Sequence, residues 1–167
     1  MSSGSQNAVA AHDLSIVQAQ SAEQVAEVRE LFLEYAHSLN FSLCFQNFDN
    51  ELAELPGDYV PPDGRLLLMH YRMQPAGCVA LHKLEPGICE MKRLYIRPAF
   101  RGKKLGVTLI DAVIAEARLI GYKFMRLDTV EPAMKDAVAL YRRFGFNEIA
   151  PYRVNPMPGT LYMERQL

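Results

Sequence analysis

The chain has 167 residues, of which 50% are hydrophobic and 22% are charged, and its formal net charge is −1. This length suits one domain with a sizeable core, and the composition is ordinary for a soluble globular protein. The near-neutral charge argues against a general nucleic-acid surface, and no apolar run approaches the ~20 residues of a membrane span. Three widely spaced cysteines predict neither a disulfide framework nor a zinc site, and they favour reduced thiols in the cytoplasm.

The first residues, 1–12, are rich in Ser, Gln and Ala, without the charged and apolar regions of a secretory signal. We expect them to form a flexible tail ahead of a single domain over residues 13–167. Alternating polarity then predicts a strand over 14–20. Ser21 and Gln24 match a capping box, which predicts a helix over about 22–39.

Residues 40–48 are rich in aromatic side chains but keep no single period. Two interpretations stay open for this segment: a loop that fills the edge of the core, or one wall of a substrate pocket. One or two helical turns are expected over 49–55. Strands follow over 65–72 and 77–84, with a turn predicted at residues 74–76 between them.

A third strand is predicted over 89–96, so these short connections indicate an antiparallel meander. Pro98 ends that strand, and a basic loop with Arg101 and Gly102 leads into a helix predicted over 103–120. The first-turn N–H groups of a helix lack internal partners, and the helix dipole adds positive charge there. We therefore interpret this turn as the site of a coenzyme pyrophosphate, against the simpler alternative of a solvated basic loop.

Gly121 matches a helix C-cap, and a strand is predicted over 123–129. The right-handed crossover of a strand–helix–strand unit makes this strand parallel to the strand before the basic loop. Pro132 suits the first turn of the next helix, and two further strands are predicted over 146–152 and 160–166. The predicted fold is an α/β domain with a mixed, mainly antiparallel sheet of about six or seven strands, one parallel pair and helices on both faces.

Two motifs in this pattern resemble the signatures of the GNAT (GCN5-related) N-acetyltransferases. Residues 101–106, Arg-Gly-Lys-Lys-Leu-Gly, resemble the Arg/Gln-x-x-Gly-x-Gly/Ala loop of that family. Residues 139–146, Ala-Leu-Tyr-Arg-Arg-Phe-Gly-Phe, resemble its second signature, and residues 92–98 look like its central strand and exit. Two motifs about 40 residues apart, with a strand–helix–strand unit between them, form a more specific signal than either motif alone.

The resemblance implies acetyl-CoA as acetyl donor, CoA as product and no metal. In the family, main-chain groups of the central strand pair with pantetheine, which maps to Leu94, Tyr95 and Ile96. N–H groups and cations of the following turn bind the pyrophosphate. That role maps to Arg101, Gly102, Lys103, Lys104, Leu105, Gly106 and Val107.

The resemblance also implies roles in catalysis. Tyr141 maps to the tyrosine that faces the coenzyme sulfur as general acid, and Glu90 maps to a glutamate that often serves as base. Alternatively, Tyr141 is a core tyrosine and Glu90 is a solvated glutamate at a strand end. A water path would then take the place of the base. Asp128 is either a structural hydrogen-bond partner or a substrate-facing residue. The residues suggested for the acceptor pocket are Phe45, Gln46, Asn47, Tyr152 and Asn155.

Two positions depart from the family pattern. Lys104 stands where the family has its middle glycine, and Met134 stands where an asparagine often precedes the tyrosine by seven residues. The predicted function is acetyl transfer to a primary amine by direct attack in a ternary complex. The rivals are a non-catalytic acyl-CoA-binding or regulatory module and a nucleic-acid- or protein-binding domain. The expected partner is a small-molecule or peptide amine, with no nucleic acid and no membrane; the oligomeric state, a homodimer included, is left open.

Overall fold

The computed structural model describes residues 13–43 and 47–167. The predicted tail over residues 1–12 and the suggested pocket residues Phe45 and Gln46 lie outside this part of the chain. In the described part, the elements follow in this order: β1 (Leu14–Gln18), α1 (Ala22–Ser38), α2 (Phe48–Glu54), β2 (Arg65–Tyr71), β3 (Gln74–Glu85), β4 (Ile88–Ile96), α3 (Leu105–Ile120), β5 (Phe124–Val130), α4 (Lys135–Arg143), β6 (Asn147–Ile149) and β7 (Thr160–Gln166).

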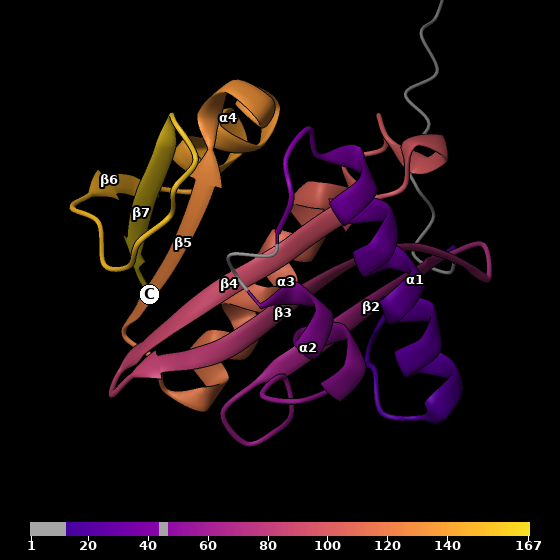
Figure 1. Cartoon of the computed structure of the whole chain (residues 1–167). Helices are drawn as coiled ribbons and strands as arrows, with labels where there is room; N and C mark the ends of the chain where they lie inside the picture. Colours follow the sequence, from indigo (N-terminus) through magenta and orange to yellow (C-terminus); the bar gives the residue numbers. More distant parts are fainter. Residues whose placement is uncertain (1–12, 44–46) are drawn as a thin grey trace, which may run out of the picture.

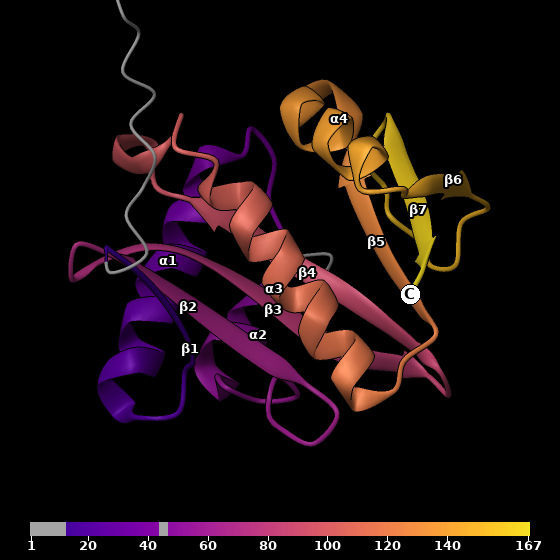
Figure 2. The same ribbon diagram turned by 180° about the vertical axis from the view of Figure 1, so that it is seen from behind.

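All of these strands belong to one sheet with the order β1-β2-β3-β4-β5-β7-β6 (Figures 1 and 2). β4 and β5 are parallel, and the other neighbouring strands of the described chain are antiparallel. The predicted mixed sheet with one parallel pair is therefore confirmed. The parallel pair arises because α3 carries the chain back across the sheet between β4 and β5.

Helices cover both faces of the sheet, as predicted. α1 and α2 lie on one face, and α3 crosses the other (Figures 1 and 2). α1 contributes Val28, Leu31 and Phe32 to one core cluster, and α3 contributes Leu109 and Ile110 to the other. These five side chains are fully buried, so each helix is held by its apolar stripe.

The signals at the helix ends are confirmed. At the start of α1, the Ser21 hydroxyl accepts a hydrogen bond from the Gln24 N–H, and the Gln24 side chain accepts one in return from the Ser21 N–H. Gly121 ends α3 with a φ of 105°, a conformation that glycine adopts without steric cost. α3 begins at Leu105 rather than near residue 103, because Lys104 adopts a left-handed conformation (φ 60°) and becomes the N-cap residue.

Three local predictions need correction. The β2–β3 turn is not at residues 74–76, which belong to β3; it is formed by Arg72 and Met73, whose φ values of 49° and 66° suit a tight hairpin turn. Pro132 does not open α4 but lies in a short 3₁₀ turn before it. The strand predicted over 146–152 is shorter, since only Asn147–Ile149 pairs with β7.

Candidate active site

The parallel pair separates soon after it forms. β4 and β5 pair only over Ile88–Glu90 and Phe124–Arg126, and beyond this point the strands diverge (Figure 1). On its other side β4 stays paired with β3 as far as Ile96. The second half of β4 therefore keeps one edge without a strand partner in the described chain, and such an edge can pair with an extended ligand.

A β-bulge lies in this half of β4. The pairing with β3 shifts so that Arg93 and Leu94 face one residue, Val79, and Arg93 has a φ of 60°. A bulge bends its strand and changes the direction of the neighbouring main-chain groups. It lies three residues beyond the last β4–β5 pair, in the half of β4 whose edge is open.

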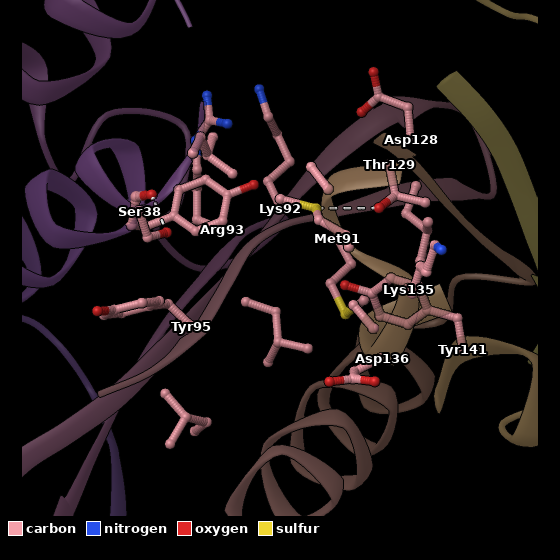
Figure 3. A pocket seen from close by; sticks show the side chains of 18 of the residues that line it. Ser38, Met91, Lys92, Arg93, Tyr95, Asp128, Thr129, Lys135, Asp136 and Tyr141 are labelled. Atoms are coloured by element: carbon pink, nitrogen blue, oxygen red, sulfur yellow. Dashed lines mark hydrogen bonds between the residues drawn. The ribbon is translucent and has the colours of Figure 1, made fainter. Parts of the chain in front are cut away.

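A cavity of about 570 Å³ occupies the space between the diverging strands. Leu94, Tyr95 and Ile96, the residues predicted to pair with pantetheine, line one wall. Arg101 lines the same cavity, and residues of β5 and α4 form the opposite wall (Figure 3). The cavity thus joins the open edge of β4 to the basic turn before α3.

The basic turn has the form of an anion site. The Thr108 N–H makes the first main-chain bond of α3, to the Lys104 carbonyl, so the N–H groups of Leu105, Gly106 and Val107 have no acceptor within the helix. Arg101 is fixed beside them, since its Nε donates to the Ile96 carbonyl at 3.0 Å.

The rest of the turn is open and basic. Lys103 is exposed, with its ammonium 5.5 Å from the centre of the Tyr71 ring, and Gly102 has a φ of 83°. A Cβ at Gly102 would meet no atom within 4 Å, so glycine is needed here for its conformation rather than for space. These cations and free N–H groups fit a phosphate-bearing ligand.

Tyr141 comes from α4 and lies at the wall opposite Tyr95, with its hydroxyl directed into the cavity (Figure 3). Its side chain is buried, and its ring packs edge-on against Phe146 at 5.9 Å between centroids. Burial raises the pKa of the Tyr141 phenol, so the hydroxyl stays protonated at neutral pH. This position and this protonation state fit a proton donor.

Glu90 has an environment that does not favour the role of general base. The residue is fully buried and does not line the large cavity. Its carboxylate accepts hydrogen bonds from His82 Nε2 at 2.8 Å and from the Tyr152 hydroxyl at 2.6 Å, and it forms an ion pair with Arg153. Burial alone would raise the pKa of Glu90, but these partners lower it to about 2. A base that works near neutral pH needs a higher pKa and access to the amine.

The partners of Glu90 belong to the segment between β6 and β7. Tyr152 and Arg153 attach this segment to β4, and Asn155 attaches it to β5 by donating from Nδ2 to Asp128 Oδ2 at 3.2 Å. Tyr152 and Asn155 were predicted to line the acceptor pocket, but they do not line the large cavity itself. The structure places them behind it, where they support Asp128 and Glu90.

The suggested pocket residue Asn47 lies elsewhere. It is the N-cap of α2 and lines a smaller cavity of about 190 Å³ beside that helix. Lys92 lines both cavities. Met134, at the N-cap of α4, lines the large cavity and accepts a hydrogen bond from the Thr129 hydroxyl through its sulfur (Figure 3).

Sequence reasoning missed a buried group of charges beside the cavity. Glu51 of α2 accepts hydrogen bonds from Arg93 at 2.9 and 3.3 Å and from the Tyr59 hydroxyl at 2.7 Å. Lys92 Nζ lies 3.6 Å from the same carboxylate. A consecutive Lys-Arg pair in the middle of a strand otherwise rich in buried residues was the one available signal, because charges rarely sit there without partners.

In the part of the chain that the structure describes, no group of three or more His, Cys, Asp or Glu side chains is arranged to hold a metal ion. Within the same residues, no helix combines the length and the apolar character needed to cross a bilayer. Cys78 and Cys89 are buried free thiols, and burial raises the pKa of both.

Comparison with known proteins gives the family. The model of the acetyltransferase (GNAT) family matches residues 25–146. An uncharacterized N-acetyltransferase of Schizosaccharomyces pombe is 40% identical over 157 residues, which cover 93% of this chain and 96% of the relative. An IAA acetyltransferase of Azospirillum brasilense is 35% identical over 109 residues, covering 64% of this chain and 70% of the relative.

Solved structures share the fold. A GNAT acetyltransferase from Staphylococcus aureus superposes with a TM-score of 0.76 at 18% identity, covering 92% of this chain and 98% of that one. The yncA protein of Salmonella typhimurium, solved with acetyl-CoA, gives a TM-score of 0.66 at 21% identity, with 92% and 94% covered.

The chain belongs to the GNAT family of acetyltransferases. The predicted class of enzyme, an acyltransferase that uses acetyl-CoA as donor, is thereby confirmed.

Proposed function

We propose that this protein transfers the acetyl group of acetyl-CoA to a primary amine by direct attack in a ternary complex, without an acyl-enzyme. One observation carries the proposal: β4 parts from β5 beside the start of α3, and Tyr141 faces the cavity that results. The acceptor is a small-molecule or peptide amine. A location in the cytoplasm, and the expectation of no nucleic-acid partner, no membrane partner and no metal cofactor, stay predictions.

The coenzyme fits the chain in two parts. The unpaired edge of β4 at Leu94, Tyr95 and Ile96 suits the pantetheine arm, because its amide groups can pair with a strand edge. The turn over residues 101–107 suits the pyrophosphate, because it offers free N–H groups, the helix dipole and nearby cations. Both parts border the same cavity, so one extended ligand can bridge them.

The residues of the chain then perform three tasks. Acetyl-CoA supplies an activated acetyl group as its thioester. The N–H groups on the open edge of β4 can donate to the oxygen that becomes negative when the amine attacks the carbonyl carbon. As the carbon–sulfur bond breaks, the Tyr141 hydroxyl gives its proton to the sulfur, and solvent later restores that proton. Holding both substrates in one cavity supplies a further share of the rate increase.

The amine must lose a proton before it attacks. Glu90 is an unsuitable acceptor because its carboxylate is buried, fully engaged and has a lowered pKa. We therefore assign this proton to a water path through the open end of the cavity, which the sequence left as the alternative to Glu90. Glu90 instead positions the segment between β6 and β7.

The test combines a binding and a turnover measurement. We expect CoA to raise the melting temperature, and we expect acetyl-CoA to release thiol only when a suitable amine is present. The absence of any CoA-dependent shift at millimolar concentration would overturn the proposal. A CoA-dependent shift without turnover on a broad amine panel would favour the non-catalytic acyl-CoA-binding module instead.

A further inference from the structure

Two oppositely charged side chains face each other where the parallel strands part. Glu90 and Arg126 form the last pair in register between β4 and β5. Lys92 and Asp128 each lie two residues further along, so they occupy corresponding positions on the same face of the sheet. Both line the large cavity, and both side chains reach toward the same end of it (Figure 3).

Lys92 contributes a positive charge that the protein balances only in part. Its side chain is 12% exposed, and its Nζ lies 3.6 Å from Glu51. That carboxylate is held more closely by Arg93 and by the Tyr59 hydroxyl. Burial lowers the pKa of the Lys92 ammonium and the charge of Arg93 lowers it further, while the carboxylates of Glu51 and Glu90 act in the opposite direction. A ligand carboxylate that reached Lys92 from the cavity would be stabilised by the charge of its ammonium.

Asp128 contributes the opposite charge on the facing strand. Its Oδ2 accepts from Asn155, which fixes the carboxylate in place. In the described part of the chain, no ion pair joins it to a lysine, arginine or histidine. The groups around it include the phenols of Tyr35 and Tyr152, whose pKa values are raised by burial and also by nearby carboxylates, Asp128 among them, and the Arg153 guanidinium, whose ion-pair partner is Glu90. A cation at this wall would therefore be stabilised.

We propose that the acceptor is a zwitterion of the amino acid class, whose ammonium group binds Asp128 and whose carboxylate binds Lys92. The proposal rests on the function proposed above and narrows its acceptor. A ligand with both charges completes the ion pairs on both walls at once, whereas a plain amine leaves Lys92 without a new partner. A peptide N-terminus has an amide next to its amine and lacks the carboxylate at that position.

The test uses matched sets of acceptors with wild-type enzyme and acetyl-CoA. One set is L-phenylalanine, L-phenylalaninamide and phenethylamine, and the same three forms are compared for leucine, methionine, serine and glutamate. We expect kcat/KM for the free acid to exceed that for the amide and the amine by about tenfold or more in at least one set, because a charged site rejects a ligand that leaves its charge unpaired.

Variants identify the residue that causes the preference for the free acid over the amide and the amine. Lys92→Met should abolish the preference for the acid by lowering kcat/KM for the acid more than for the amide, and Lys92→Gln provides a second form of the same test. Lys135→Met is the matched control, because Lys135 is an exposed lysine that lines the same cavity from α4 and should leave the acid-to-amide ratio unchanged. Asp128→Asn should lower kcat/KM for all three forms. A CoA-dependent melting shift identifies the variants that are folded.

Three outcomes would overturn the inference: amide and acid used equally well, a preference for the acid that survives both Lys92 variants, or turnover of no amino acid in the panel. None of these outcomes contradicts the proposed function if another amine releases thiol from acetyl-CoA. The proposed function fails separately, when CoA produces no melting shift and no amine releases thiol.

Discussion

The two ends of the active site are built in different ways. The proposed coenzyme end comes from one continuous stretch, residues 94–107, and offers main-chain groups at a strand edge and a helix start. The proposed acceptor end is lined by side chains of α1, β4, β5 and α4, while α2 and the segment between β6 and β7 hold Arg93, Glu90 and Asp128 in place. A main-chain site tolerates changes of side chain, whereas a side-chain site changes its chemistry with each substitution.

The acceptor end also depends on buried charge, which the coenzyme end does not. Glu51 with Arg93, and Glu90 with Arg153, are ion pairs in which at least one partner is almost completely buried. Breaking such a pair costs more than breaking an exposed one, because the remaining charge keeps its desolvation penalty. We therefore expect substitutions at the acceptor end to reduce stability and substitutions in the basic turn to act mainly on coenzyme binding.

Tyr141 lies where the two ends meet, and its replacement should have the largest effect. Tyr141→Phe removes the proposed proton donor but keeps the ring that packs against Phe146. We expect kcat to fall by about 10²- to 10⁴-fold, the usual contribution of general acid–base catalysis, with a much smaller change in the Kd for acetyl-CoA. Steady-state kinetics and calorimetry provide the two numbers. Equal turnover in the variant and the wild type would remove the acid role.

Glu90→Gln should produce the next largest effect, and it should appear at the acceptor end. The variant keeps the size of the side chain but loses the charge that Arg153, Tyr152 and His82 contact. We expect the free energy of unfolding at pH 7 to fall by about 2 kcal/mol, as for hydrogen bonds to a charged group. KM for the acceptor should rise more than KM for acetyl-CoA. Glu116→Gln, which breaks the more exposed pair with Arg65, is the control and should cost less.

The pH dependence of stability gives a second test of the Glu90→Gln variant against the wild type. The pKa of Glu90 is lowered from 4.5 to about 2 in the folded protein, so its carboxylate stabilises the fold above the unfolded pKa. That stabilisation is lost as the pH falls from about 4.5 toward 2. Denaturant melts across this range should show a smaller acid-induced loss for Glu90→Gln than for the wild type. If the two proteins lose stability in parallel as the pH falls, Glu90 does not cause this pH dependence.

The same contrast explains what the sequence could predict. The strand, the turn and the helix start of the proposed coenzyme end were predictable because they are local features, marked here by Pro98, Gly102 and the helical spacing that follows. The capping box of α1 and the cap at Gly121 are local too, and the structure confirms both. The β2–β3 turn was misplaced because Arg72 and Met73 have positive φ values without the glycine or asparagine that usually marks such a turn.

The acceptor end could not be predicted in the same way. The partners of Glu90 lie 8 to 63 positions away in the chain, and Arg93 is 42 positions from Glu51. No local pattern indicates that such distant residues come into contact. Whether a carboxylate is buried or solvated depends on those contacts. For this reason the sequence assigned Glu90 a base role that its surroundings do not favour, and it gave Lys92 no role.

Coenzyme binding should respond more weakly to the loss of one cation in the basic turn. Arg101→Ala removes a guanidinium that is exposed and anchored to the Ile96 carbonyl. An exposed ion pair contributes about 0.2–1 kcal/mol, so we expect Kd for CoA to rise by at most about fivefold, with a weaker dependence on salt. Arg118→Ala, at the other end of α3, is the control and should leave Kd unchanged. An unchanged Kd for Arg101→Ala would separate this residue from the coenzyme.

Lys104→Gly should have the smallest effect, and it tests why the family favours glycine at this position. Lys104 has a φ of 60°, a conformation that costs a non-glycine residue about 1–2 kcal/mol. Glycine removes this strain but adds freedom to the unfolded chain, so the net gain in stability should stay below about 1 kcal/mol. Lys103→Gly removes the same charge from a neighbour outside that conformation and should slightly lower the melting temperature. If conformation alone explains the glycine, both variants weaken CoA binding equally; tighter binding by Lys104→Gly would show that the phosphate needs a close approach to the backbone at this residue.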